Sequence, residues 1–221
     1  MPHIFVRGGK REMEIVDTIT WTGSSVTTAT LKIPTATIQP GDYMLSFIAA
    51  RASVSSTPTT PTGWTLHLSQ AFGNSKLLIY GKEYVAGDTD ATVLQAVSNG
   101  LSATVALRAA KNSAPVDVMA SNTGTVTGSS TTSTATTTVP NTLVIRALWL
   151  VNSLTNNPPI ITWAGSLTPV EGVTQGLSGN STALSIVAVK QPVAGSSGTL
   201  VATNTPASTS GVWATVAIAP Q

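Results

Sequence analysis

The chain has 221 residues, of which 42% are hydrophobic and 9% are charged. This composition argues against intrinsic disorder, which goes with low hydrophobicity and high charge, and the length allows one large or two small domains. The net charge of +2 comes without a dense basic stripe, and cysteine is absent. A nucleic-acid-binding protein, a disulfide scaffold and a thiolate metal site are therefore excluded.

Residues 1–17 differ from the rest of the chain, because they hold six of the twenty charged residues. These residues lack the apolar core of about 7–15 residues that a secretory signal carries. The sequence as a whole contains no run of about 18 apolar residues, the length needed to cross a bilayer. We expect an arm that is either a solvated leader or lies along a neighbouring subunit, with a bend at Gly8-Gly9. The residues expected to make its contacts are Phe5, Arg7, Lys10 and Arg11.

From Ile19 onward the chain alternates between strand-like runs and turns. The polar residues are mainly threonine and serine, and β-branched threonine favours strands. Residues 27–33 end before Pro34, and residues 43–50 alternate with the strand period after a Gly41-Asp42 turn. Further strands are predicted over residues 64–69, 76–84, 93–97 and 103–109.

A second copy of this pattern follows Pro115. Lys82 and Val85-Ala86-Gly87 return as Lys190 and residues 193–195, at an offset of 108. Three more matches follow the same order: residues 22–25 with 127–130 at an offset of 105, Asp42 and Trp64 with Asn141 and Trp163 at 99, and residues 103–107 with 214–218 at 111. We interpret the series as an internal duplication.

The predicted fold class is all-β, with two similar antiparallel β-sandwich units of jelly-roll type. The arm covers residues 1–17, and the units cover residues 18–114 and 115–221. The repeat is too long for a solenoid or a propeller blade, and its turn spacing is typical of a sandwich. The sequence leaves open whether the units form two separate sandwiches or one interleaved body.

The two histidines, His3 and His67, do not suggest catalysis. His3 lies in the arm and His67 in an alternating strand-like run, and neither belongs to a nucleophile motif of the kind that a triad requires. Zinc would need three or four nitrogen, sulfur or oxygen ligands, which this sequence does not readily supply. We therefore expect no enzyme, no cofactor and no metal.

One close pair of carboxylates, Asp88 and Asp90, leaves three alternatives. The pair can form a turn, hold Ca²⁺ together with backbone oxygens, or flank a glycosidic bond with the help of another segment. The second copy has Ser196 and Gly198 at the matching places. Turn chemistry is favoured, because the sister unit lacks the pair.

Trp64 and Trp163 occupy matching positions, each beside a threonine. Paired tryptophans at a surface can form a platform for a sugar ring, whereas packing in a sandwich core is the commoner outcome. Core packing is favoured, and the pair is kept as a candidate ligand platform.

The motifs T-[IVL]-P, GD-x-[ML]-L, GWT-L, K-x-x-[VA]-AGD-T and A-T-V-A-L-R resemble a β-rich family encoded in the virion gene blocks of tailed bacteriophages. They are carried by residues 31–34, 41–45, 63–66, 82–89 and 103–108, and the second copy repeats them in degraded form. The resemblance implies a component of the virion, made in the host cytoplasm, with no catalytic residues to carry over. Such families include head decoration proteins and parts of tails or fibres.

Two functions follow from this resemblance. The first is a decoration or cement protein on the outer surface of the phage head, bound to the major capsid protein and assembled as a homo-oligomer, with a trimer favoured over a dimer. The alternative is a tail, baseplate or fibre module that binds a glycan on the host cell surface through Trp64, Trp163 and the polar loops 53–62 and 152–159. Nucleic acid and membranes are not expected as partners.

Overall fold

The computed structural model describes residues 12–24, 28–52, 57–73, 75–95, 97–152, 157–175, 181–206 and 208–221. The strands before Pro115 are β1 (Glu14–Ser24), β2 (Thr28–Leu31), β3 (Tyr43–Ala52), β4 (Thr65–Phe72), β5 (Ser75–Glu83), β6 (Ala91–Gln95) and β7 (Val97–Arg108). The strands after it are β8 (Val116–Val126), β9 (Ser129–Thr131), β10 (Thr136–Thr137), β11 (Thr142–Asn152), β12 (Ile160–Trp163), β13 (Glu171–Gln175), β14 (Ser181–Gln191), β15 (Gly195–Ser196), β16 (Val201–Thr205) and β17 (Ser208–Ile218). A single turn of 3-10 helix, Ala164–Ser166, follows β12. The prediction of an all-β protein is confirmed.

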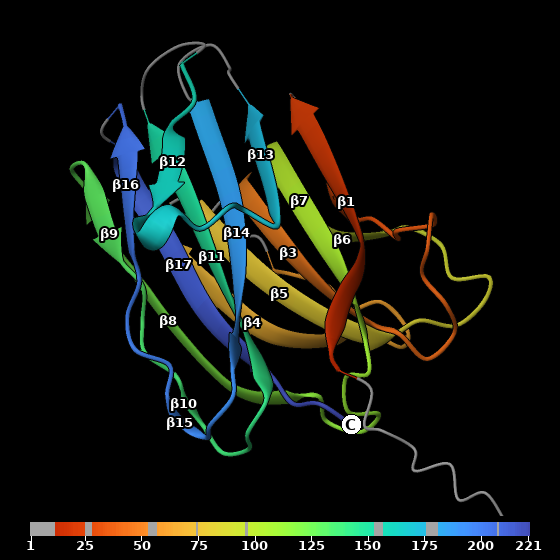
Figure 1. The fold of residues 1–221 in the computed structure, drawn as a ribbon. Coiled ribbons are helices and arrows are strands. Elements are labelled where there is room, and N and C mark those ends of the chain that lie inside the picture. The colour runs from red at the N-terminus through yellow and green to blue at the C-terminus, as the bar shows by residue number, and fades with distance from the viewer. Residues whose placement is uncertain are drawn as a thin grey trace, which may run out of the picture.

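Two five-stranded antiparallel sheets form the body of the molecule (Figure 1). The first-half sheet has the strand order β1-β7-β3-β5-β4, and the second-half sheet has the order β8-β17-β11-β14-β13. Within the described residues no helix has the length and apolar character needed to cross a membrane.

The inner faces of the two sheets pack against each other in a shared core. Phe47 of β3 and Ile79 of β5 belong to the same buried cluster as Ile145 and Trp149 of β11 and Ile186 of β14. All five are at most 1% exposed. The two halves of the chain therefore form one sandwich across a common core, rather than two bodies joined by a linker.

Smaller sheets cover the outer faces. Strands β2 and β6 lie over the first-half sheet, where Leu31 and Leu94 pack with Ile48. The sheet β12-β16-β9 lies over the second-half sheet, where Ala202 packs with Leu148. Each five-stranded sheet is thus covered on both faces, which is why β3 and β11 are buried along nearly their whole length.

The two five-stranded sheets connect their strands in the same order, and they share an irregularity. Ile15 and Asp17 pair with consecutive residues of β7, so that Val16 bulges out of β1. Val116 and Val118 likewise pair with consecutive residues of β17. These shared features accord with an internal duplication, which stays a prediction.

The pairing corrects two of the sequence offsets. The sequence match of residues 103–107 with 214–218 makes Ile218 the counterpart of Leu107. Leu107 pairs with Tyr43 of β3, and Ile218 pairs with Leu143 of β11. Strands β3 and β11 therefore correspond at an offset of 100 rather than 99. A shift of one residue moves every side chain to the other face of a strand, so the difference matters. By the same comparison Gly23 corresponds to Gly124, and the matched residues 127–130 lie beyond it.

The predicted arm is too long by several residues. Residues 14–17 belong to β1, and Met13 is buried in the shared core at 3% exposure. Strand pairing with β7 holds this segment, which the charge pattern alone could not indicate. The expected contact residues Phe5, Arg7, Lys10 and Arg11 lie outside the described residues.

Gly81 allows a close approach between β5 and the side chain of Tyr43. The Tyr43 hydroxyl lies 2.8 Å from His67 Nε2, and it crosses directly over Gly81 to reach it. A Cβ at position 81 would lie 1.7 Å from Tyr43 Oη and 2.6 Å from His67 Nε2. Glycine is therefore required here for space.

We predict that Gly81→Ala lowers the free energy of unfolding by about 1–3 kcal/mol or more, because the added methyl group must displace Tyr43. The matched control is Gly124→Ala in β8, where the new Cβ would meet Trp213 at an ordinary 3.5 Å. Urea unfolding of the two variants measures the difference. Equal stability of both variants would contradict the role given to Gly81.

Candidate interaction surface

The charged residues are distributed unequally between the two halves of the chain. Sixteen of the twenty lie at or before Lys111, and the four that follow are Asp117, Arg146, Glu171 and Lys190. Of these, Arg146 is buried at 4% exposure, and Lys190 pairs with Glu12. The outside of the second half is consequently almost without charge.

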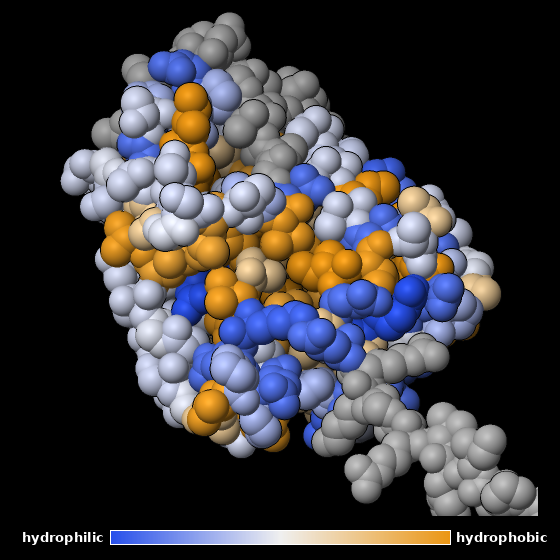
Figure 2. Space-filling model, in the orientation of Figure 1, coloured by the Kyte–Doolittle hydropathy of each residue, from blue (hydrophilic) through white to orange (hydrophobic). Residues whose placement is uncertain are grey.

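The outer face of the sheet β12-β16-β9 is the clearest part of this uncharged surface. Alternate residues of the three strands point outward and are exposed, whereas Trp163 and Ala202 between them point inward. We call the outward set the neutral face; its members are Ser129, Thr131, Ile160, Thr162, Val201, Thr203 and Thr205. In Figure 2 the side of the molecule that carries β9 and β16 is mostly pale, as expected of threonine and serine.

The neutral face exposes large apolar side chains as well as hydroxyl groups. Ile160 is 69% exposed and Val201 is 40% exposed. The hydroxyl groups both donate and accept hydrogen bonds, so such a face can meet an uncharged partner without a charge to desolvate.

The corresponding surface of the first half is smaller and charged. Strands β2 and β6 form a two-stranded sheet, on which Thr92 of β6 is exposed. At its edge Lys32 Nζ lies 2.5 Å from Asp90 Oδ2. The two halves therefore present different chemistry on a similar scaffold.

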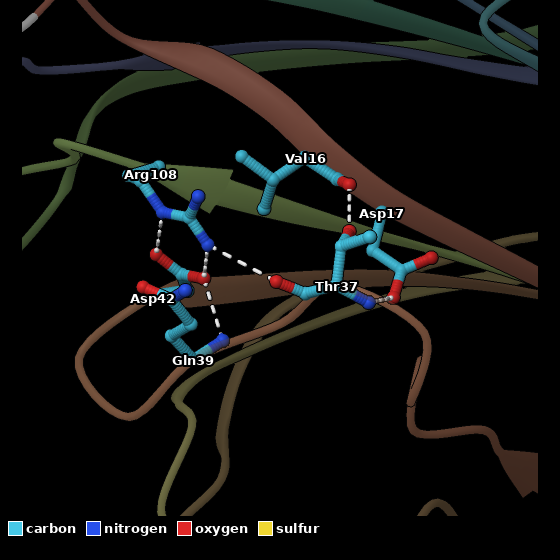
Figure 3. A network of polar contacts seen from close by, with 6 residues as sticks. All are labelled: Val16, Asp17, Thr37, Gln39, Asp42 and Arg108. Carbon is cyan, nitrogen blue, oxygen red and sulfur yellow. Dashed lines mark hydrogen bonds and ion pairs between the residues drawn. The ribbon is translucent and has the colours of Figure 1, made fainter.

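A polar network ties the loop before β3 to the ends of β1 and β7 (Figure 3). Arg108 donates from Nε and Nη2 to the two carboxylate oxygens of Asp42, at 3.1 and 2.8 Å, and from Nη2 to the Thr37 carbonyl at 3.1 Å. The hydrogen bond with Asp42 raises the pKa of Arg108. The Thr37 N–H donates to Asp17 at 2.8 Å, and the Thr37 hydroxyl donates to the Val16 carbonyl.

The second half repeats one part of this network. The Thr138 N–H and hydroxyl both donate to the carboxylate of Asp117, as Thr37 is held at the end of β1. Thr142 stands at the position of Asp42 and Ala219 at that of Arg108, so the ion pair has no counterpart there. We assign the network to positioning of the loop.

An apolar cavity lies where the described chain begins and ends. It has a volume of about 880 Å³ and is lined by Met13, Leu143, three prolines and the last residues of the chain. Glu12, the first described residue, is on its rim. Residues 1–11 are therefore attached beside this cavity.

Trp64 and Trp163 do not form a ligand platform. Trp64 is 7% exposed and packs between the first-half sheet and the β2-β6 sheet, whereas Trp163 is 2% exposed and packs under the neutral face. The Trp163 indole N–H donates to Ser185 Oγ at 2.9 Å. Core packing, the favoured interpretation of the sequence, is confirmed, and the sugar platform is wrong because neither ring has an open face.

The other candidate residues are also engaged within the fold. Asp88 pairs with Lys82 at 2.5 Å and Asp90 pairs with Lys32, so the two carboxylates face different lysines rather than a common cation. Among the described residues there is no group of three or more histidine or acidic side chains that could hold a metal ion. His3 lies outside the described residues.

Sequence reasoning missed the neutral face. The run Val201-Ala-Thr-Asn-Thr205 alternates outward and inward side chains, and no charged residue occurs between Lys190 and the end of the chain. Those two signals together could have identified it.

Comparisons of the chain with protein-family models, with curated proteins and with solved structures find no match.

We predict that the protein loses stability as the pH falls below about 6.5, the ordinary pKa of histidine. Burial lowers the pKa of His67, so the unfolded chain binds a proton that the folded chain resists. The loss continues until the pH reaches the lowered pKa of the folded state, and stability is insensitive to His67 above about 7. Urea unfolding between pH 5 and 8 should show a smaller slope for His67→Gln, and parallel curves would contradict the assignment.

Proposed function

We propose that this chain is a non-enzymatic structural protein of a tailed-bacteriophage virion, and that it binds other proteins of the particle through the neutral face. The partner that fits best is the major capsid protein on the outside of the head, which would make the chain a decoration protein that stabilises the shell. The proposal rests on the virion-family motifs of residues 31–34, 41–45, 63–66, 82–89 and 103–108 together with the neutral face.

The neutral face is the single observation that supports protein binding most directly. The cores of protein interfaces are depleted of charged residues, and the seven outward residues of β9, β12 and β16 include none. A flat sheet surface repeated on many copies can bury apolar area at about 25 cal/mol per Å² without leaving a charge unpaired. Stabilisation of a shell needs such contacts, each modest and many times repeated.

The N-terminal segment provides a second contact in this proposal. Residues 1–11 start beside the 880 Å³ cavity and include four residues expected to touch a neighbouring subunit. Assembly as a homo-oligomer, with a trimer favoured, would let each arm reach the next copy. The arm of the proposal is thus residues 1–11, since residues 14–17 are part of β1.

The alternative, a tail, baseplate or fibre module that binds a host glycan, loses the support of Trp64 and Trp163, because both are buried. Its other expected contacts are the polar loops 53–62 and 152–159, of which residues 53–56 and 153–156 lie outside the described residues. The position of the protein in the particle separates the two ideas: many copies on the head agree with decoration, and a few copies on the tail do not.

We predict that Thr203→Lys prevents binding to phage particles assembled without the protein. A lysine in the middle of the neutral face would have to lose its water on docking, and an unpaired buried charge costs more than the roughly 1.4 kcal/mol that corresponds to a factor of ten. The expected loss of affinity is therefore about tenfold or more. Sedimentation of particles with the purified protein, followed by gel quantification of bound copies, gives the measurement.

The matched control is Thr92→Lys, which places the same charge at an exposed threonine of β6, outside the neutral face. It should bind like the unchanged protein. Equal binding by all three proteins would rule out the neutral face as the contact surface, whatever the remaining role of the arm.

We also predict that a protein lacking residues 1–11 folds normally but no longer binds particles or assembles. Met13 and β1 remain in this variant, so the shared core is intact. Circular dichroism and thermal unfolding check the fold, and analytical ultracentrifugation with the particle assay checks association. Unchanged oligomeric state and binding would show that the arm makes no contact between copies.

A further inference from the structure

Arg146 is a buried cation on the outer face of β11. The residue is 4% exposed, and its Nη2 donates to the carbonyl oxygens of Ser197 and Gly198, at 2.8 and 3.3 Å. Its Nε has no hydrogen-bond partner among the described residues. Buried arginines are rare unless they are paired with an anion, so we expect an anionic partner for this side chain.

A cavity of about 360 Å³ lies beside this guanidinium, where β11, β14 and β15 meet. Its polar lining comes from Arg146, Lys190, Gln191, Ser196 and Ser197, and valines, a proline and an alanine complete it. No carboxylate is among the described residues that line it. The Lys190 ammonium pairs with Glu12, which lies on the rim of the larger cavity.

The first half supplies its own carboxylate at the matching turn. After β5, Asp88 accepts a hydrogen bond from the Val85 N–H at 2.9 Å and pairs with Lys82. After β14, the loop match of Val85-Ala86-Gly87 with residues 193–195 places Ser196 where the first half has Asp88, although β5 and β14 themselves correspond at an offset of 107 by their pairing. The second half therefore has a buried cation near this turn, Arg146, where the first half has Ser46, and it has a hydroxyl in place of the internal carboxylate.

We propose that the cavity beside Arg146 binds one oxyanion group, a carboxylate or a phosphate, which takes the place that Asp88 has in the first half. The planar guanidinium presents its N–H groups in a fork that matches two oxygens of such a group. The Ser196 hydroxyl accepts from the Gly198 N–H at 3.2 Å, and its own O–H offers a further donor at the cavity wall.

The electrostatics of the site agree with this assignment. Burial lowers the pKa of the Arg146 guanidinium. An anion beside the buried guanidinium offsets the loss of water around its charge and satisfies its donors, so binding of an oxyanion stabilises the folded protein. The cavity is large enough for a small molecule that carries the oxyanion, and its valine and proline walls suit an apolar remainder.

The test compares thermal unfolding of the full chain in sodium acetate, sodium phosphate and sodium chloride at equal ionic strength. For a chain of this length we expect a rise in Tm of about 3–6 °C at an anion concentration roughly ten times Kd, relative to chloride. Arg146→Gln should lose this rise. A response to acetate alone identifies a carboxylate site, and a response to phosphate alone identifies a phosphate site.

A second variant keeps the proposal falsifiable if Arg146→Gln does not fold. Ser196→Asp adds an internal carboxylate to the cavity wall, so it should raise Tm in chloride and remove the response to the added anion. The matched control is Ser129→Asp, which adds the same charge on the neutral face and should leave the anion response unchanged. The proposal is overturned if the unchanged protein shows no anion-specific rise, or if Ser196→Asp keeps the full response.

Discussion

The packing of the first-half sheet against the second-half sheet is the interaction on which the remaining structure depends. Phe47 and Ile79 on one side and Trp149 and Ile186 on the other are almost completely withdrawn from water. Neither sheet could bury this face alone, and a sheet with an uncovered apolar face is not independently stable. The shared core therefore fixes which faces of the two sheets point outward, and it makes folding of the two halves interdependent.

Because the inner faces are committed to this core, differences between the halves are concentrated on the outside. The first half stabilises its turns with ion pairs, such as Asp42 with Arg108 and Lys82 with Asp88. The second half has Thr142 and Ala219 in the places of Asp42 and Arg108, and its Arg146 donates to backbone carbonyl oxygens. One scaffold thus carries a charged outer surface and an uncharged one. The uncharged surface is suited to contact with protein, and the unpaired cation within it is suited to an anion.

Local signals predicted much of the strand layout. The alternating run 43–50 became β3 (Tyr43–Ala52), and residues 76–84 became β5 (Ser75–Glu83). The boundaries predicted for the strands 93–97 and 103–109 were less accurate, because β7 continues without a break from Val97 to Arg108. The dipeptide Asn99-Gly100 is a common turn signal, yet Gly100 lies opposite Ala50 within the sheet. The pairing of β7 with both β1 and β3 overrides the turn preference of that pair.

By itself the sequence determined the all-β class, the approximate strands, the common order of the two halves and the scarcity of charge after Lys111. These are properties of neighbouring residues, and strand propensity and alternation express them directly. The tertiary structure alone decided that the halves share one core, that Trp64 and Trp163 are buried, and that Arg146 lies beside a cavity without a carboxylate. Those facts depend on register and on contacts between segments far apart in the chain, and a shift of a single residue would reverse them.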